Sequence, residues 1–241
     1  MKHTFKKIFS DIFEKNGLHA YINDENIEKF WNLTQLMLET NAVMNITAIT
    51  DIEKIIPLHY ADCVKIAELI PQNATVADIG CGGGFPILPL AIVRPDLKLI
   101  GIDSTEKKAR YVSETAKKLG LNVDTIAGRA EELAKMPGMR QNFDVVVSRA
   151  VARLNILDEL CMPFTKINGH FIAMKGAAGM QELHEAKTGI HRLGGILEKA
   201  EEYELHACDQ TEQRTVFVIR QNSTVPDTYP RQFANIKKKP L

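Results

Sequence analysis

Hydrophobic residues in the first 70 positions follow the spacing of amphipathic helices. Phe9, Ile12 and Phe13 recur on one helical face. After Asp24, a residue type that favours the start of a helix, the run ENIEKFWNLTQLMLETN carries a second, broad apolar face. This pattern predicts an N-terminal helical cap over residues 1–70.

From Ala74 onward the pattern changes to short runs rich in β-branched residues. The runs ATVADIG, KLIGID, VDTIAG, FDVVVSRA and GHFIAMKG predict strands. Helical spacing between and after them predicts helices over Pro86–Arg94, Thr105–Leu119, Ala130–Met136, Leu154–Lys166 and Gln181–Leu193. This alternation predicts an α/β domain with a Rossmann-like, mainly parallel sheet over residues 71–221.

The C-terminal part of the chain carries two further patterns. The runs ILEKAEEYEL and RTVFVIRQ predict two final strands that can close as a hairpin. Residues 222–241 have no apolar periodicity and contain a cluster of lysines. We expect them to form an extended or disordered basic tail.

The composition of the chain limits which kinds of partner and which cell compartment we expect for the protein. The 30 basic side chains balance 30 acidic ones, so any surface for a nucleic acid has to be local. The four cysteines form no CxxC pair and no zinc-like cluster, which indicates reduced thiols and no metal. The N-terminus lacks the apolar core of a signal peptide, and no stretch has the length of a membrane span. We expect a cytoplasmic monomer.

A glycine-rich loop, DIGCGGGF, follows the first predicted strand. Gly80 and Gly82 fit a dinucleotide fingerprint, but Phe85 stands at its third glycine position. The spacing DxGxGxG resembles the S-adenosylmethionine loop of Rossmann-like methyltransferases. In that reading Asp78 faces the ammonium group of the ligand. A purely structural turn is the alternative.

Polar residues also follow the second and third predicted strands. Asp103, with Ser104, can accept hydrogen bonds from both ribose hydroxyls of an adenosine, although a helix cap would need the same residue type. Ala130 and Glu131 fit the position beside an adenine, although acidic residues also suit the start of a helix. Because the carboxyl ends of parallel strands share one edge of the sheet, these residues together predict an S-adenosylmethionine pocket.

The residues after the fourth predicted strand, where the methyl acceptor is expected, carry few of the known catalytic motifs. Ser148–Ala152 lacks the (D/N)PP(Y/F) turn of many enzymes that methylate exocyclic amines. Cys161 lies too far past the strand for a cytosine C5 nucleophile, and a core thiol explains it better. Lys175 could belong to a ribose 2′-O set, but Arg149 stands where its aspartate is expected. These three chemistries are disfavoured.

Several motifs in combination resemble the GidB (RsmG) family. They are DIGCGGGFPILPLAIVRPD, IDSTEKKARYV, FDVVVSRAVARL and AMKG, with MNITAITD and LHYADC upstream and YPR…KKKPL at the end. The resemblance implies methyl transfer from S-adenosylmethionine to N7 of one guanine in 16S ribosomal RNA, the RNA of the small subunit. By the same resemblance, the positions expected to bind the ligand are Gly80, Phe85, Ala130, Glu131 and Arg149. The chain departs from the family at Cys81 and Gly83, and its tail lacks the usual Gly-Thr-Pro stretch.

This chemistry agrees with the missing motifs. Guanine N7 is an acceptor with a free lone pair and no proton. Its methylation needs no general base, so catalysis can consist largely of positioning. The positioning candidates are Arg149, Lys175 and His59, which lies one helical turn from Asp62. A salt bridge to a local acid is the alternative role of Arg149.

Contact with RNA is expected from a few basic residues. The candidates are Arg153, Lys175, Arg231, Lys237, Lys238 and Lys239, although a solvated tail would explain the last four equally well. Three other functions remain open from the residues alone: a methyltransferase with another acceptor, an RNA-binding module without turnover, and a dinucleotide oxidoreductase.

Overall fold

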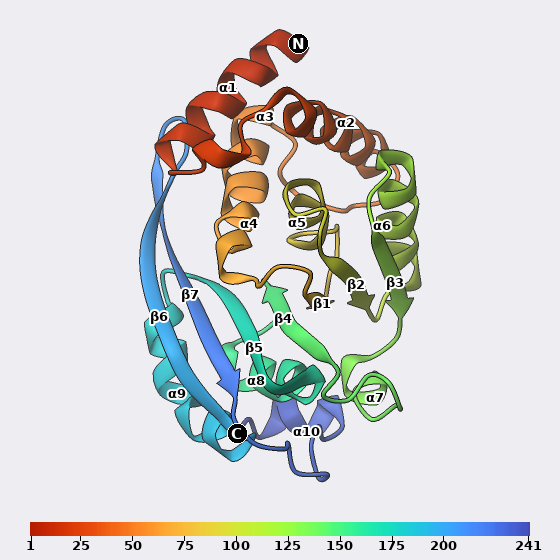
Figure 1. Ribbon diagram of the computed structural model, residues 1–241, viewed down its shortest axis with the longest axis vertical. Coiled ribbons are helices and arrows are strands. Elements are labelled where there is room, and N and C mark those ends of the chain that lie inside the picture. Colours follow the sequence, from red (N-terminus) through yellow and green to blue (C-terminus); the bar gives the residue numbers. More distant parts are fainter.

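A seven-stranded sheet forms the centre of the protein, whose computed structural model describes residues 1–241 (Figure 1). The strand order is β3-β2-β1-β4-β5-β7-β6. The bounds are β1 Thr75–Ile79, β2 Lys98–Asp103, β3 Val123–Ala127, β4 Phe143–Arg149, β5 Thr165–Gly176, β6 Gly195–His206 and β7 Thr211–Gln221.

The first five strands are parallel, and β7 pairs antiparallel with both β5 and β6. The strand order reverses between β1 and β4, and such a switch point leaves a crevice at the carboxyl ends of the strands. The predicted Rossmann-like sheet and the closing hairpin are both confirmed.

Ten α-helices cover the two faces of the sheet. Their bounds are α1 Lys2–Lys15, α2 Asp24–Asn41, α3 Ile52–Ile55, α4 Asp62–Val64, α5 Ile87–Val93, α6 Glu106–Leu119, α7 Ala130–Leu133, α8 Leu154–Cys161, α9 Gly179–Arg192 and α10 Phe233–Lys238. A π-helical segment, Ile56–Ala61, joins α3 to α4, and short 3₁₀ turns lie at His19–Tyr21, Ala67–Leu69 and Met162–Phe164.

Several predicted helix bounds differ from the structure: the helix expected to reach Met136 ends at Leu133, and the one expected from Gln181 begins at Gly179. The helix expected to run to Lys166 ends at Cys161, because Pro163 forces a 3₁₀ turn and β5 begins at Thr165. Helix α2 is capped by Asn23, one residue before the expected Asp24, and the Asn23 side chain accepts a hydrogen bond from the amide of Asn26.

Each face of the sheet has its own hydrophobic core. The larger core joins helices α1–α6 to one face, and the smaller core joins α7–α10 to the other. Within the larger core, the rings of Phe9, Phe13 and Phe30 pack with centroids 3.8 to 5.9 Å apart. The N-terminal helices are therefore part of the main core.

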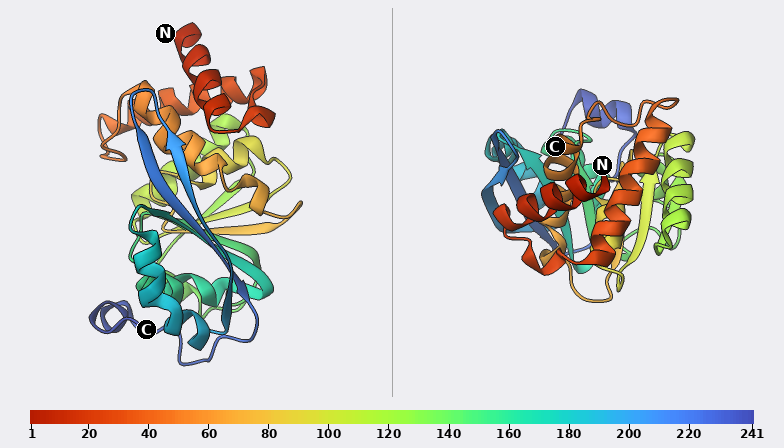
Figure 2. Two further views of the ribbon diagram at one scale, coloured as in Figure 1. Left: turned by 90° about the vertical axis from the view of Figure 1, so that its left-hand side faces the viewer. Right: turned by 90° about the horizontal axis from the view of Figure 1, so that it is seen from above.

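The β6–β7 hairpin extends beyond the rest of the sheet and reaches the N-terminal helices (Figure 2). There the Asn16 side chain donates a hydrogen bond to the carbonyl of His206 and accepts one from its amide. The hairpin thus connects the cap with the C-terminal third of the chain.

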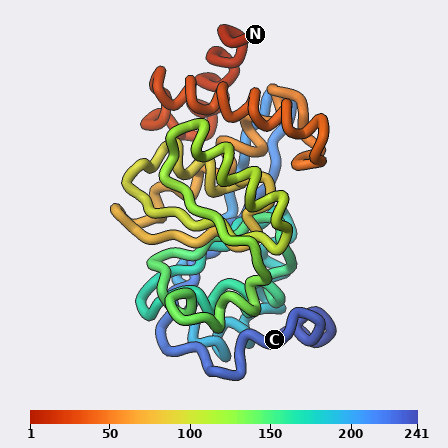
Figure 3. The backbone as a smooth tube through the Cα atoms, turned by 90° about the vertical axis from the view of Figure 1, so that its right-hand side faces the viewer, coloured from red at the N-terminus to blue at the C-terminus, as the bar shows by residue number.

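The segment 222–241 is folded, which corrects the expectation of an extended or disordered tail. It forms α10 and buries Val225 and Ile236, at the end of the molecule opposite the N-terminus (Figure 3). Arg231 is anchored on Glu159, which is fully buried. The tail is held by single apolar contacts, by the ion pairs Arg231–Glu159 and Arg140–Asp227, and by hydrogen bonds from Arg140. Such contacts leave no periodic pattern in the sequence. No helix of the protein has the length and apolar character needed to cross a membrane.

Candidate functional site

Two cavities open at the carboxyl edge of the parallel strands. The glycine-loop cavity, of about 150 Å³, is lined by Ile79, Gly80, Ile102, Asp103, Ser104, Gly128, Arg129, Ala130, Glu131, Val151, Leu160 and Phe233. The arginine cavity, of about 640 Å³, is lined by Ile49, Leu58, His59, Asp62, Arg149, Ala150, Val151, Ala152, Arg153, Met174, Lys175, Gly176, Glu182, Glu212 and Arg214. Val151 lines both and therefore lies between them.

The glycine loop is tied to the end of β2. The amides of Gly80 and Cys81 both donate to the carbonyl of Ile102, and the amide of Gly82 donates to Asp103 Oδ2 at 2.9 Å. The other oxygen of Asp103 accepts from the amide of Thr105 at 2.8 Å. Asp103 thereby fixes two loops at once and keeps part of its carboxylate at the cavity.

Gly80 has a φ of +76°, in the left-handed region that glycine tolerates best. A Cβ atom here would lie 2.4 Å from Val151 Cγ2. The backbone of the loop can therefore be approached closely only while position 80 has no side chain.

Asp78, at the end of β1, is fully buried. Its Oδ2 accepts a hydrogen bond from the amide of Ile87 at 3.3 Å, and its Oδ1 has no partner. Burial raises the pKa of this carboxyl to about 7. A buried acceptor without a donor is unusual, and it suits a site that a ligand completes.

The residues predicted beside the adenosine lie together. Ser104 borders the glycine-loop cavity after β2, and Ala130 and Glu131 border it at the start of α7. Glu131 is buried apart from a small exposed area and lies 3.6 Å from the guanidinium of Arg129. The cavity has an acidic and an apolar side, as adenosine would need.

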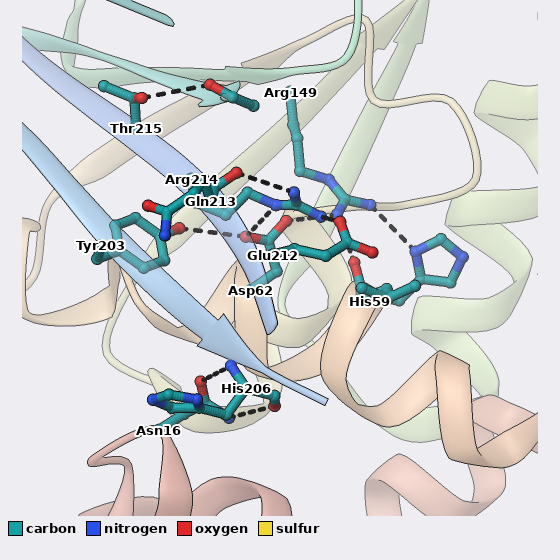
Figure 4. Close-up of polar contacts among 12 residues, drawn as sticks. Asn16, His59, Asp62, Arg149, Tyr203, His206, Glu212, Gln213, Arg214 and Thr215 are labelled. Atoms are coloured by element: carbon teal, nitrogen blue, oxygen red, sulfur yellow. Dashed lines mark hydrogen bonds and ion pairs between the residues drawn. The ribbon is translucent and has the colours of Figure 1, made fainter. Parts of the chain in front are cut away.

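Arg149, at the end of β4, is the centre of the arginine cavity (Figure 4). Its Nη1 donates to Asp62 Oδ2 at 2.9 Å and to the carbonyl of Leu58 at 2.8 Å. Its Nη2 lies 3.3 Å from His59 Nδ1, and its Nε is buried without a partner. The N-terminal cap thus holds the guanidinium, while one buried N–H is left without an acceptor.

Asp62 receives further groups from the hairpin. The Tyr203 hydroxyl donates to Asp62 Oδ1 at 3.1 Å, and the Arg214 Nε lies 3.4 Å from the same oxygen (Figure 4). Arg214 also pairs with Glu212 at 2.6 Å. Because charges of both signs alternate, the arginine cavity is polar without a strong net charge.

His59, which lines the arginine cavity, packs against Phe85 of the glycine loop. Their rings stack with centroids 4.4 Å apart, and the Arg149 Cζ lies 5.6 Å from the centre of the Phe85 ring. Burial and the neighbouring Arg149 charge lower the pKa of His59 to about 3, so the imidazole is neutral. Phe85 does not line the glycine-loop cavity and packs instead behind the loop.

The predicted RNA-contacting residues have different environments. Lys175 is buried and pairs with Glu182 at 2.9 Å, and Arg153 pairs with Glu185 at 2.6 Å on the surface. Arg231 pairs with Glu159. Lys237, Lys238 and Lys239 are exposed and form no ion pair, and they lie at α10, away from the arginine cavity.

Arg214, Glu212, Val151 and Phe233 line the cavities but were not singled out from the sequence. Arg214 enters because β7 runs antiparallel to β5, which sets the start of β7 beside the end of β5. The predicted hairpin contained that signal. Nothing in the tail sequence indicated Phe233. No group of three His, Cys, Asp or Glu side chains lies close enough to hold a metal ion.

Comparisons with known proteins agree with this arrangement. The family model described as rRNA small subunit methyltransferase G (GidB) matches residues 26–216. The chain is 40% identical over 238 residues to Ribosomal RNA small subunit methyltransferase G of Clostridium perfringens strain 13, covering 97% of this chain and 99% of that one. It is 39% identical over 239 residues to the protein of the same name from Brevibacillus brevis, covering 98% and 99%.

A solved structure shares the fold. TYW2 of M. jannaschii, in complex with AdoMet, superposes with a TM-score of 0.54 at 18% identity, over 67% of this chain and 75% of that chain. This likeness supports the Rossmann-like class I methyltransferase fold that the sequence predicted. With the family model and the curated relatives, it leads to one conclusion: the chain belongs to the rRNA small subunit methyltransferase G (GidB) family.

Proposed function

We propose that this protein transfers the methyl group of S-adenosylmethionine to N7 of a guanine in 16S ribosomal RNA. The observation that carries the proposal is the pair of cavities at the switch point of the sheet, with Val151 between them. The residues of one cavity suit the adenosine of the methyl donor, and the other cavity, of about 640 Å³, is large enough for a base. The family membership supports the ribosomal RNA substrate.

The glycine-loop cavity fits S-adenosylmethionine by the chemistry of its residues. Asp103 would accept hydrogen bonds from the ribose hydroxyls, and Ala130 and Glu131 would border the adenine. Asp78 is fully buried and does not line this cavity, but its unpartnered oxygen would supply the acceptor that the ammonium group of the ligand needs once the glycine loop admits it. When bound, the ligand supplies a methyl group activated by a sulfonium.

The arginine cavity fits an acceptor that needs no general base. Guanine N7 has a lone pair and no proton, so no side chain has to remove one. The groups that could act as bases are already engaged: Asp62 is bound to Arg149, and Glu182 is bound to Lys175. We propose that Arg149 positions the guanine, with its free Nε or its guanidinium plane available to the base.

Contact with the RNA would come from local basic groups, since the chain has no net charge. Lys237, Lys238 and Lys239 form no ion pair and therefore remain available to phosphates. Arg153 and Lys175 would have to exchange a carboxylate partner for a phosphate.

Nucleoside analysis of 16S ribosomal RNA by mass spectrometry tests the proposal. RNA from a strain lacking the gene should lose one 7-methylguanosine, and the wild-type gene should restore it. The purified protein should also restore it in vitro when supplied with S-adenosylmethionine and either naked RNA or small-subunit particles. A deletion strain that keeps all of its 7-methylguanosine would contradict the assignment.

A further inference from the structure

We propose that Phe233, on helix α10 of the C-terminal segment, is a cofactor-binding residue that forms an aromatic wall against the adenine of S-adenosylmethionine. The inference rests on the proposed function, since it concerns the ligand of the glycine-loop cavity. It assigns the C-terminal segment a role in binding the methyl donor.

Phe233 is the aromatic residue of the glycine-loop cavity. It shares the cavity with Asp103, Ser104, Ala130 and Glu131, which are the residues at the ends of β2 and β3. Adenosine would lie beside the same four residues. A half-buried ring at this position would offer a flat apolar face to a flat base, and bases stack favourably on aromatic side chains.

The ring is held in place by its own segment. Two residues before it, Arg231 donates from Nε and Nη2 to both oxygens of Glu159, at 2.6 to 3.1 Å, and its backbone amide donates to the same carboxylate. Three residues after it, Ile236 is fully buried. Phe233 therefore lies between two fixed points, which favours a preformed wall over a mobile tail.

The helix that anchors Arg231 also contributes a residue to the cavity. Glu159 and Leu160 are adjacent in α8, and Leu160 lines the glycine-loop cavity while Glu159 holds Arg231. Arg140 adds a second tie, because its guanidinium donates to the carbonyls of Val225 and Tyr229. The position of α10 is thus coupled to α8, the helix that contributes Leu160 to the same cavity.

A purely structural role is the alternative. Phe233 also packs against the smaller hydrophobic core, so its ring could simply cover that core. The two roles differ in what a substitution changes. An adenine wall affects the affinity for every ligand that carries an adenosine, whereas a core cover affects the melting temperature alone.

Isothermal titration calorimetry on the full-length protein tests the proposal, with S-adenosylmethionine, S-adenosylhomocysteine and adenosine as ligands. Phe233→Ala should weaken all three by about tenfold, the equivalent of about 1.4 kcal/mol. Phe233→Tyr should bind nearly as wild type, and Phe233→Leu, which keeps the apolar bulk without the aromatic face, should lie between. Asn235→Ala, on an exposed position of the same helix, is the matched control and should leave all three affinities unchanged.

The outcomes separate this inference from the proposed function. A wild-type protein that binds none of the three ligands would overturn both. A wild-type protein that binds S-adenosylmethionine while Phe233→Ala binds equally well would overturn the aromatic wall alone. A Phe233→Ala variant with a lower melting temperature and unchanged affinities would assign the ring to the core instead.

Discussion

The two cavities at the edge of the sheet are built from different materials. The glycine-loop cavity is formed mostly by backbone groups and small side chains at the ends of successive strands. The arginine cavity is formed by paired charges from the cap, β4, β5, α9 and the hairpin. We infer that the first is fixed by segments close in the chain except at Phe233 of α10, while the second exists only once several distant segments have come together.

The two cavities should also differ in how much free energy a substitution costs. A cavity lined by backbone changes little when an exposed charge is removed, because its hydrogen bonds are made within the sheet and its loops. A cavity lined by buried ion pairs is destabilised by the loss of any one charged side chain, since its removal leaves the partner as an uncompensated buried charge. Four substitutions or conditions, in order of decreasing effect, test whether this contrast holds.

The first test concerns the ion pair between Arg231 and Glu159, which lies on the side of the glycine-loop cavity. It is an exception to the contrast, because here a buried ion pair supports the cavity that is otherwise built from backbone groups. Arg231→Ala leaves the fully buried Glu159 carboxylate without its cation, and we expect a loss of about 3–5 kcal/mol in the free energy of unfolding. Urea denaturation measures it. The double variant Glu159→Gln/Arg231→Ala is the control and should regain much of the loss. A single variant as stable as wild type would show that the tail does not anchor this cavity.

The second concerns Arg149. We expect Arg149→Ala to lower methyl transfer at saturating S-adenosylmethionine by about 100-fold, because the acceptor loses its positioning group. Affinity for S-adenosylmethionine should change by less than about threefold, or under 1 kcal/mol. Transfer of a labelled methyl group and calorimetry measure the two quantities. Methyl transfer within a few-fold of wild type would refute the role, and a joint loss of both would show that the cavities are not independent.

The third concerns Gly80. Gly80→Ala forces a side chain into the left-handed region and against Val151, so the loop and Val151 must shift at the cavity. We expect about 30-fold weaker binding of S-adenosylmethionine, or about 2 kcal/mol. Gly120→Ala is the matched control, since Gly120 has a φ of +64° and a Cβ added there would meet no atom within 4 Å. It should lower stability while leaving the affinity unchanged. An equal loss of affinity in both variants would indicate a general effect of strain.

The fourth is the dependence of binding on pH. Burial raises the pKa of Asp78 to about 7, so the carboxyl is neutral below that pH and charged above it. The charged form attracts an ammonium group, and affinity for S-adenosylmethionine should therefore fall severalfold as the pH decreases through about 7. Calorimetry between about pH 5.5 and 7.5 measures this trend, below the pKa at which an α-amino group itself deprotonates. Asp78→Asn should bind more weakly at the higher pH and show a flatter profile.

The contrast also explains what could be predicted from the sequence. Gly80, Asp103 and Glu131 each follow a strand in the chain, so strand order alone was enough to bring them together. Arg214 enters the arginine cavity from a strand whose neighbours depend on the whole sheet, and Asp62 meets Tyr203 across 141 residues. The tail was misjudged because a buried ion pair such as Arg231–Glu159 has no periodic signature.

The hairpin that reaches the N-terminal helices has a consequence for biosynthesis. Asn16 and His206 are 190 positions apart, so the first helices leave the ribosome long before the strand that fixes them has been translated. Most of the glycine-loop cavity comes from segments that are close in the chain, but its proposed adenine wall, Phe233, is translated after the hairpin that completes the arginine cavity. During translation the nascent protein would thus complete both pockets late, and it becomes competent to act on RNA only after the hairpin and α10 have been made.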